Sequence, residues 1–137
     1  MRGLSGIRPA GVAPGPELVS NGNFATDTVW TKGAGTTIPG GSLSINSAGV
    51  TNNYQALPGN PIHAGCHYQV TYTITGYVSG TIALLLATGT SGAIRSSNGT
   101  FTERLFVTSV GSQNFNLQAQ AGGFVGSVSS ASCKKVP

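Results

Sequence analysis

Residues 66–78 read CHYQVTYTITGYV, and this stretch decides the fold class. From Cys66 to Ile74 every second side chain is apolar or aromatic, and the side chains between them are polar. A period of two over about ten residues is the signature of a β-strand that is buried on one face. We therefore predict a strand here whose Tyr68 and Tyr72 enter the core. Its outward polar face would carry Gln69, Thr71 and Thr73.

Short strand-like segments separated by glycine-rich turns continue on both sides of this stretch. Ser79-Gly80 reads as a turn into residues 81–88, and Pro39-Gly40-Gly41 reads as another turn. No segment has the pattern of a helix longer than one turn. Many short strands with turn signals indicate an antiparallel sandwich or barrel of about eight strands. The further strands are expected at residues 17–19, 42–46, 54–57, 81–88, 101–110, 114–120 and 124–136, with a short one at 93–96.

The composition agrees with an all-β domain. Only 7% of the 137 residues are charged, against about 25% in an average soluble domain. Glycine, serine, threonine and asparagine replace the missing charge, and uncharged hydroxyl and amide side chains suit the solvent faces of strands. The length fits a single domain, which we place at residues 17–137.

Residues 1–16 are rich in glycine and proline, which oppose both a helix and a central strand. We expect an extended N-terminal arm. It would either dock on a neighbouring subunit or be a tail without a partner, and the isolated apolar and basic side chains favour docking. The residues expected to make these assembly contacts are Arg2, Leu4, Ile7 and Arg8.

The charge pattern does not favour nucleic acid or membrane as a partner. The net charge is +4, and the basic residues form no cluster that is interleaved with aromatic residues. The longest uninterrupted apolar run, Ile82 to Ala87, is far too short to span a bilayer. The N-terminus has no apolar segment of signal-peptide length, so we expect assembly in the cytoplasm of the producing cell.

Side chains that could support catalysis are few. The carboxylates are Glu17, Asp27 and Glu103, and no two of them stand in a context that suggests paired acid–base work. No GxSxG nucleophile motif is present. We expect that the protein is not an enzyme.

The histidines and cysteines do not predict a metal site or any other cofactor. His63, Cys66 and His67 are close in sequence, but alternation along a strand turns His67 to the face opposite Cys66. Cys66 and Cys133 are the two cysteines of the chain. They could form a disulfide, although two buried thiols suit a chain without a CxxC motif better.

The aromatic residues offer candidates for a binding surface. Trp30 follows a turn near the start of the domain and is expected to fill the core. Tyr54 and Tyr77 lack the core parity of Tyr68 and Tyr72, so they are the candidates for exposed platforms that stack on sugar rings. The polar row of Gln69, Thr71 and Thr73 could hydrogen-bond the same ligand or simply face water.

The chain resembles the jelly-roll carbohydrate-binding modules, the galactose-binding-like sandwiches found beside xylanases and cellulases. Glu17 to Phe24 reads ELVSNGNF and is followed by Trp30, and the similarity extends through residues 55–57, 64–72 and 124–128. The resemblance implies two antiparallel sheets in a jelly-roll sandwich. Family members often hold calcium through acidic groups. Because Asn23 and Ser129-Ser130 occupy the positions of those groups, we predict that this chain has lost the calcium.

Stand-alone copies of this module are similar to small structural proteins of tailed bacteriophages. This resemblance implies a virion structural protein, assembled in the host cytoplasm. We expect a head decoration or cement protein that binds and stabilises the capsid, with the phage capsid protein and copies of itself as partners. The alternative is a glycan-binding module of a tail fibre or baseplate.

Overall fold

The computed structural model describes residues 13–137, and this part of the chain contains strands and loops but no helix. The prediction of an all-β fold is confirmed. The seven strands are β1 (Thr36–Thr37), β2 (Leu43–Ser47), β3 (Thr51–Ala56), β4 (Cys66–Leu86), β5 (Thr90–Ser91), β6 (Gly99–Val107) and β7 (Asn114–Val136).

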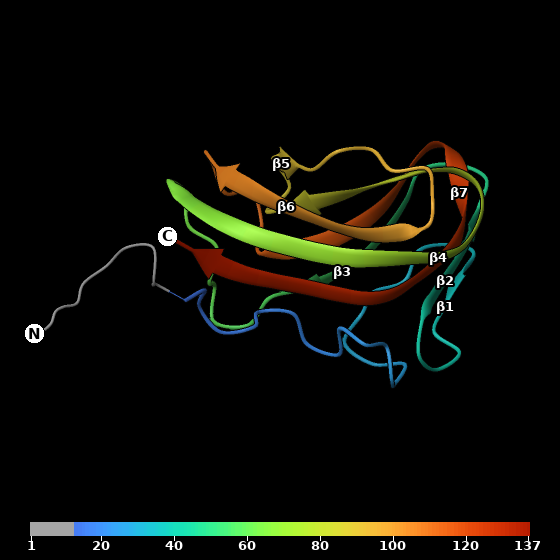
Figure 1. Cartoon of the computed structure of the whole chain (residues 1–137), viewed down its shortest axis with the longest axis horizontal. Coiled ribbons are helices and arrows are strands. Elements are labelled where there is room, and N and C mark those ends of the chain that lie inside the picture. Colours follow the sequence, from blue (N-terminus) through green and yellow to red (C-terminus); the bar gives the residue numbers. More distant parts are fainter. Residues whose placement is uncertain (1–12) are drawn as a thin grey trace, which may run out of the picture.

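Two long strands, β4 and β7, organise the fold. They pair antiparallel along almost their whole length, from His67 opposite Val136 to Leu86 opposite Phe115. The first half of β4 pairs with β6 on its other side, whereas the first half of β7 pairs with β3. All strands thus belong to one antiparallel network, which bends over on itself so that its halves face each other as in a β-sandwich (Figure 1).

The prediction of a turn at Ser79-Gly80 is wrong. Strand β4 continues past these residues because its partner β7 stays beside it, with Ser79 opposite Val125 and Gly80 opposite Phe124. Register shifts on both sides of this point mark a bend. Gly80 has φ +84°, and a Cβ on it would lie 2.1 Å from the Gly123 carbonyl oxygen, so the bend requires glycine.

Several predicted strand limits also differ from the structure. Residues 114–120 and 124–136 are one strand, β7, and the strand expected at 93–96 is a single bridge between Arg95 and Ile82. The short strands β1 and β5 were not predicted. Neither has a distinct pattern in the sequence, because each is only two residues long.

Residues 17–19 do not form the predicted strand, although Leu18 donates a backbone hydrogen bond to the Cys133 carbonyl. The reason lies in the Glu17 side chain. Its carboxylate accepts the backbone N–H of Cys133 at 2.8 Å, in the place where a carbonyl of a paired strand would accept it. Before it, Gly15 donates to the Lys135 carbonyl. The predicted assembly residues of the arm, Arg2, Leu4, Ile7 and Arg8, lie outside the described residues.

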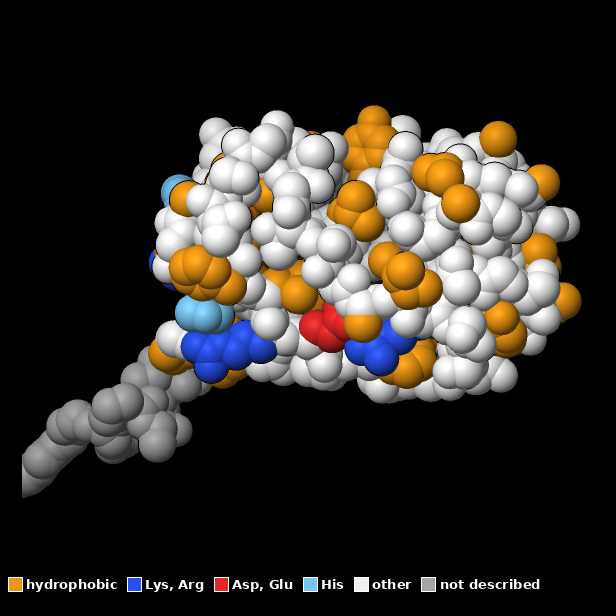
Figure 2. Space-filling view, turned by 90° about the horizontal axis from the view of Figure 1, so that it is seen from above, with side chains coloured by type: hydrophobic (Ala, Val, Ile, Leu, Met, Phe, Trp, Pro, Cys, Tyr) orange, Lys and Arg blue, Asp and Glu red, His pale blue; other side chains and the backbone are white. Residues whose placement is uncertain are grey.

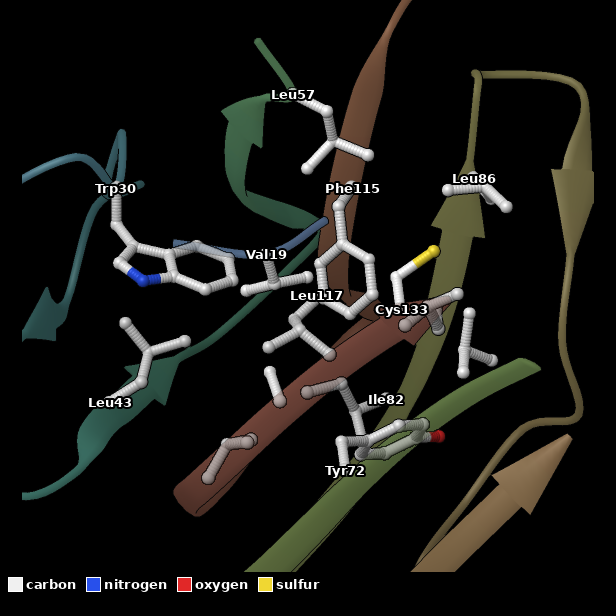
Figure 3. Packing of buried hydrophobic residues seen from close by; sticks show 14 of the residues in the cluster. Val19, Trp30, Leu43, Leu57, Tyr72, Ile82, Leu86, Phe115, Leu117 and Cys133 are labelled. Atoms are coloured by element: carbon white, nitrogen blue, oxygen red, sulfur yellow. The ribbon is translucent and has the colours of Figure 1, made fainter. Parts of the chain in front are cut away.

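The core lies between the two halves of the bent sheet (Figure 3). Tyr68 and Tyr72 of β4 are fully buried, as the alternation in residues 66–74 predicts. The interpretation of Trp30 as a core residue is also confirmed. Its ring lies 5.1 Å from that of Phe24 and 6.0 Å from that of Phe115, and its indole N–H donates to the Asn21 carbonyl.

The two cysteines are free thiols, Cys133 buried and Cys66 half-buried. Cys133 stands opposite Val70 on the neighbouring strand, four positions from Cys66. Four residues of strand span about 13 Å, well beyond the roughly 7 Å between Cα atoms that a disulfide can bridge. Cys66 and Cys133 therefore cannot form a disulfide with each other.

Candidate functional site

A pocket of about 320 Å³ opens on the outward face of the half built by β3, β7 and the end of β4. Tyr54 of β3 pairs with Asn116 of β7, which in turn pairs with Leu85 of β4. The side chains of such a cross-strand row lie on one face of the sheet. The volume of the pocket falls at the lower end of the range for small-molecule sites, roughly 300–1,000 Å³. The remaining residues that line it are Asn52, Thr88, Asn114 and Gln118.

Strand β3 presents this face because its inward side carries buried amides that are hydrogen-bonded within the domain. Asn53 is completely buried; its side-chain oxygen accepts the Gly33 N–H at 3.0 Å, and its amide group donates to the Leu117 carbonyl at 3.1 Å. Gln55 is also buried and makes two hydrogen bonds to the backbone of Ser20. These inward amides fix which side of β3 faces the solvent, and hence the position of Tyr54.

The outward amides form a connected network. The Asn116 side-chain oxygen accepts the backbone N–H of Asn53 at 3.0 Å. Its amide nitrogen donates to Asn52 Oδ1 at 2.9 Å, and Gln118 donates to the same oxygen at 2.8 Å. Because each amide is held by the next, the wall of the pocket is ordered before any ligand arrives.

The pocket carries no formal charge. None of the residues that line it is acidic, a lysine, an arginine or a histidine, and Tyr54 supplies its one aromatic ring. Charged side chains are scarce elsewhere on the surface too: Figure 2 shows a face with few of them, gathered toward one edge of the view. Amide groups around a half-exposed ring can hydrogen-bond hydroxyl or carbonyl groups of a neutral ligand while the ring covers an apolar patch of it.

The structure separates the residues that the sequence suggested as one glycan site. Tyr54 lies in the pocket. Tyr77 does not: it packs on Phe124 with ring centroids 5.9 Å apart and donates its hydroxyl to the Gly80 carbonyl. Gln69, Thr71 and Thr73 lie on the outward face of the other half of the sheet, away from Tyr54.

There the threonines bond mainly to each other. Thr71 and Thr102 are joined through their hydroxyls at 3.0 Å, and Thr73 is joined to Thr100 at 2.9 Å and accepts from Ser130 at 3.0 Å. These pairs form a ladder of hydroxyl groups along this face. It has the character of a solvated strand face.

The amides of the pocket were missed in the sequence, although a signal for them was present. Residues 114–118 read NFNLQ, in which Phe115 and Leu117 alternate with amides. The alternation predicts a strand with an amide face. What the sequence does not provide is the pairing that brings this face beside Asn52 and Tyr54, which are 60 or more positions away along the chain.

One ion pair fixes the loop after β5. Glu103 Oε2 accepts the Arg95 guanidinium at 2.6 Å and the Ala93 N–H at 2.9 Å, and Arg95 lies over the Phe101 ring. Burial, with the Glu103 charge nearby, raises the pKa of Tyr72 to about 12. This cluster lies outside the pocket, and its hydrogen bonds stabilise the loop after β5.

The described residues contain neither a cluster of metal ligands nor a membrane-spanning helix. Among residues 13–137 no three histidine, cysteine or acidic side chains stand together as metal ligands would. The same part of the chain has no helix of the length and hydropathy needed to cross a membrane.

A comparison with solved structures finds the enzymatically active domain of tailspike protein 4 from bacteriophage CBA120. The two folds superpose with a TM-score of 0.56 at 16% identity, over 88% of this chain and 21% of that chain. The present chain therefore spans about a fifth of that tailspike domain. The likeness supports the all-β fold but does not single out a carbohydrate-binding jelly roll. No family model and no curated protein matches the sequence.

Proposed function

We propose that this chain is a glycan-binding module of a bacteriophage tail protein, and that the pocket around Tyr54 is its binding site. The observation that carries the proposal is the uncharged pocket in which one tyrosine ring stands among side-chain amides. Sugars present hydroxyl groups at their edges and C–H groups on their ring faces. Amides match the first and an aromatic ring matches the second.

The fold comparison supports the tail over the head of the virion. A protein named a tailspike is a tail component, and its domain resembles this chain over most of the chain's length. No finding favours the head decoration that the sequence resemblance suggested. Binding to a capsid protein, self-association and the arm contacts of Arg2, Leu4, Ile7 and Arg8 stay predictions.

A binding role without catalysis agrees with the positions of the carboxylates. Glu17 accepts hydrogen bonds from Ser132 and Cys133, and Asp27 is paired with Lys32 at 2.7 Å. Glu103 is paired with Arg95. None of the three lines the pocket, so an acid–base pair is not available there.

A glycan array tests the proposal with three proteins: the wild type, Tyr54→Ala and Gln69→Ala. Both substitutions remove a polar, outward-facing side chain, but only Tyr54 lines the pocket. We expect the wild type and Gln69→Ala to bind the same bacterial surface glycans and Tyr54→Ala to lose at least ten-fold in affinity. If the wild type binds no glycan, or if only Gln69→Ala loses binding, the proposal is wrong.

A further inference from the structure

The orientations of the pocket amides are fixed from one end of the network. A backbone N–H can only donate, so the atom of Asn116 that accepts from the Asn53 N–H is its oxygen. Its nitrogen then faces Asn52, which must turn its own oxygen toward it. Gln118 donates to that same oxygen and accepts from Gln120 through its Oε1. No choice of amide orientation remains open along this chain of bonds.

This orientation leaves the pocket with unused donors. Within residues 13–137, both N–H bonds of Asn52 and one each of Asn116 and Gln118 have no acceptor. The Asn52 oxygen, in contrast, already accepts two hydrogen bonds, which is its capacity. The fixed part of the wall therefore selects a ligand group that accepts hydrogen bonds, such as a carbonyl or a carboxylate oxygen.

Two features of the pocket favour a carbonyl. A carboxylate would lose its hydration without a cation beside it, because the lining has no lysine, arginine or histidine. Leu85, whose side chain shares the pocket with the amides, offers an apolar contact for a methyl group. An acetamido group combines a carbonyl with a methyl on one small planar unit.

We propose that the pocket recognises sugars that carry an N-acetyl group. The acetamido carbonyl accepts from the N–H groups of Asn52 and Asn116, and its methyl group contacts Leu85. The sugar ring lies beside Tyr54. This inference rests on the proposed function and specifies the substrate class of the same site.

Asn52→Asp is the decisive variant. The new carboxylate can still accept from Asn116 and Gln118, so the network that orients the wall is retained. Both free N–H donors are lost, and a negative charge faces the ligand carbonyl. Asn23→Asp is the matched control. It introduces the same charge on an exposed residue outside the pocket, and its side-chain oxygen keeps the hydrogen bond from the Ala25 N–H.

The experiment is an NMR titration of the full chain with methyl glycosides of N-acetylglucosamine, N-acetylgalactosamine and N-acetylmannosamine. The parent glucose, galactose and mannose glycosides and glucuronate serve as comparisons. We expect at least one N-acetylated sugar to bind ten-fold more tightly than its parent and to shift the side-chain N–H signals of Asn52 and Asn116. Asn52→Asp should remove this preference, and Asn23→Asp should retain it.

The outcomes separate this inference from the proposed function. Equal binding of parent and N-acetylated sugars, or tighter binding of glucuronate, overturns the acetamido inference while glycan binding itself stands. An unchanged preference in Asn52→Asp also overturns it. Binding of other glycans on the array, with none of these sugars bound, overturns the inference alone, whereas an array without any ligand overturns the proposed function as well.

Discussion

The register of β3 can be tested through two neighbouring asparagines, Asn52 and Asn53. Asn53 points inward, fully buried, and satisfies the Gly33 N–H and the Leu117 carbonyl, whereas Asn52 points outward into the pocket. In Asn53→Ala two backbone groups inside the domain lose their partner. Each unsatisfied group costs about 1–3 kcal/mol, so we expect a loss of about 2–6 kcal/mol. That is a large part of the 5–15 kcal/mol typical of a domain.

Asn52→Ala is the control, because it makes the same chemical change one position away on the same strand. Its lost hydrogen bonds are exposed to water, and we expect a cost within about 0.5 kcal/mol. The stability of both variants is measured by urea unfolding, followed by circular dichroism. If the free energy of unfolding depends on urea concentration with the same slope in both variants, the difference between their unfolding midpoints reports a difference in stability. Equal costs for the two variants would refute the register, since a slip of one residue turns Tyr54 into the core and abolishes the pocket.

Three further predictions concern the scaffold around the pocket. Glu103→Gln should lower the free energy of unfolding, measured with urea, by about 1.5–3 kcal/mol, because it removes the charge that Arg95 binds. A loss of stability below about 0.5 kcal/mol would contradict the ion pair. Gly80→Ala should lower the melting temperature far more than Gly65→Ala. Both glycines have φ +84°, but only at Gly80 would a Cβ meet a carbonyl oxygen of β7. Equal shifts of the melting temperature would rule out this close approach. Burial raises the pKa of Cys133 from 9.0 to about 12, so its thiol ionises first in the unfolded chain. Stability should then fall by about 1.4 kcal/mol per pH unit between these values, and Cys133→Ala should have a shallower alkaline slope; identical slopes would argue against the shift.

Much of the fold follows from local pattern. Alternation alone places Tyr68 and Tyr72 in the core. Bends and turns were harder to distinguish, because both use glycine. Gly80 looks like the centre of a turn in the sequence, and only the continued pairing with β7 reveals that the strand continues through a bend.

The site was predictable only in part. Tyr54 could be singled out as an aromatic outside the core parity, but Tyr77 satisfied the same criterion and packs against Phe124 instead. The inward amide Asn53 runs against the expectation that polar side chains of a strand face water. Its partners, on the loop before β1 and on β7, are known only once the tertiary structure is known.

The most direct test of the account follows the backbone amide signals of the isotope-labelled protein during titration with its tightest array glycan. The account predicts shifts confined to the outward face around the pocket, at Asn52, Tyr54, Asn116 and Gln118, with the signals of Gln69, Thr71 and Thr73 unmoved. Shifts centred on those three residues, with the pocket signals unmoved, would contradict it.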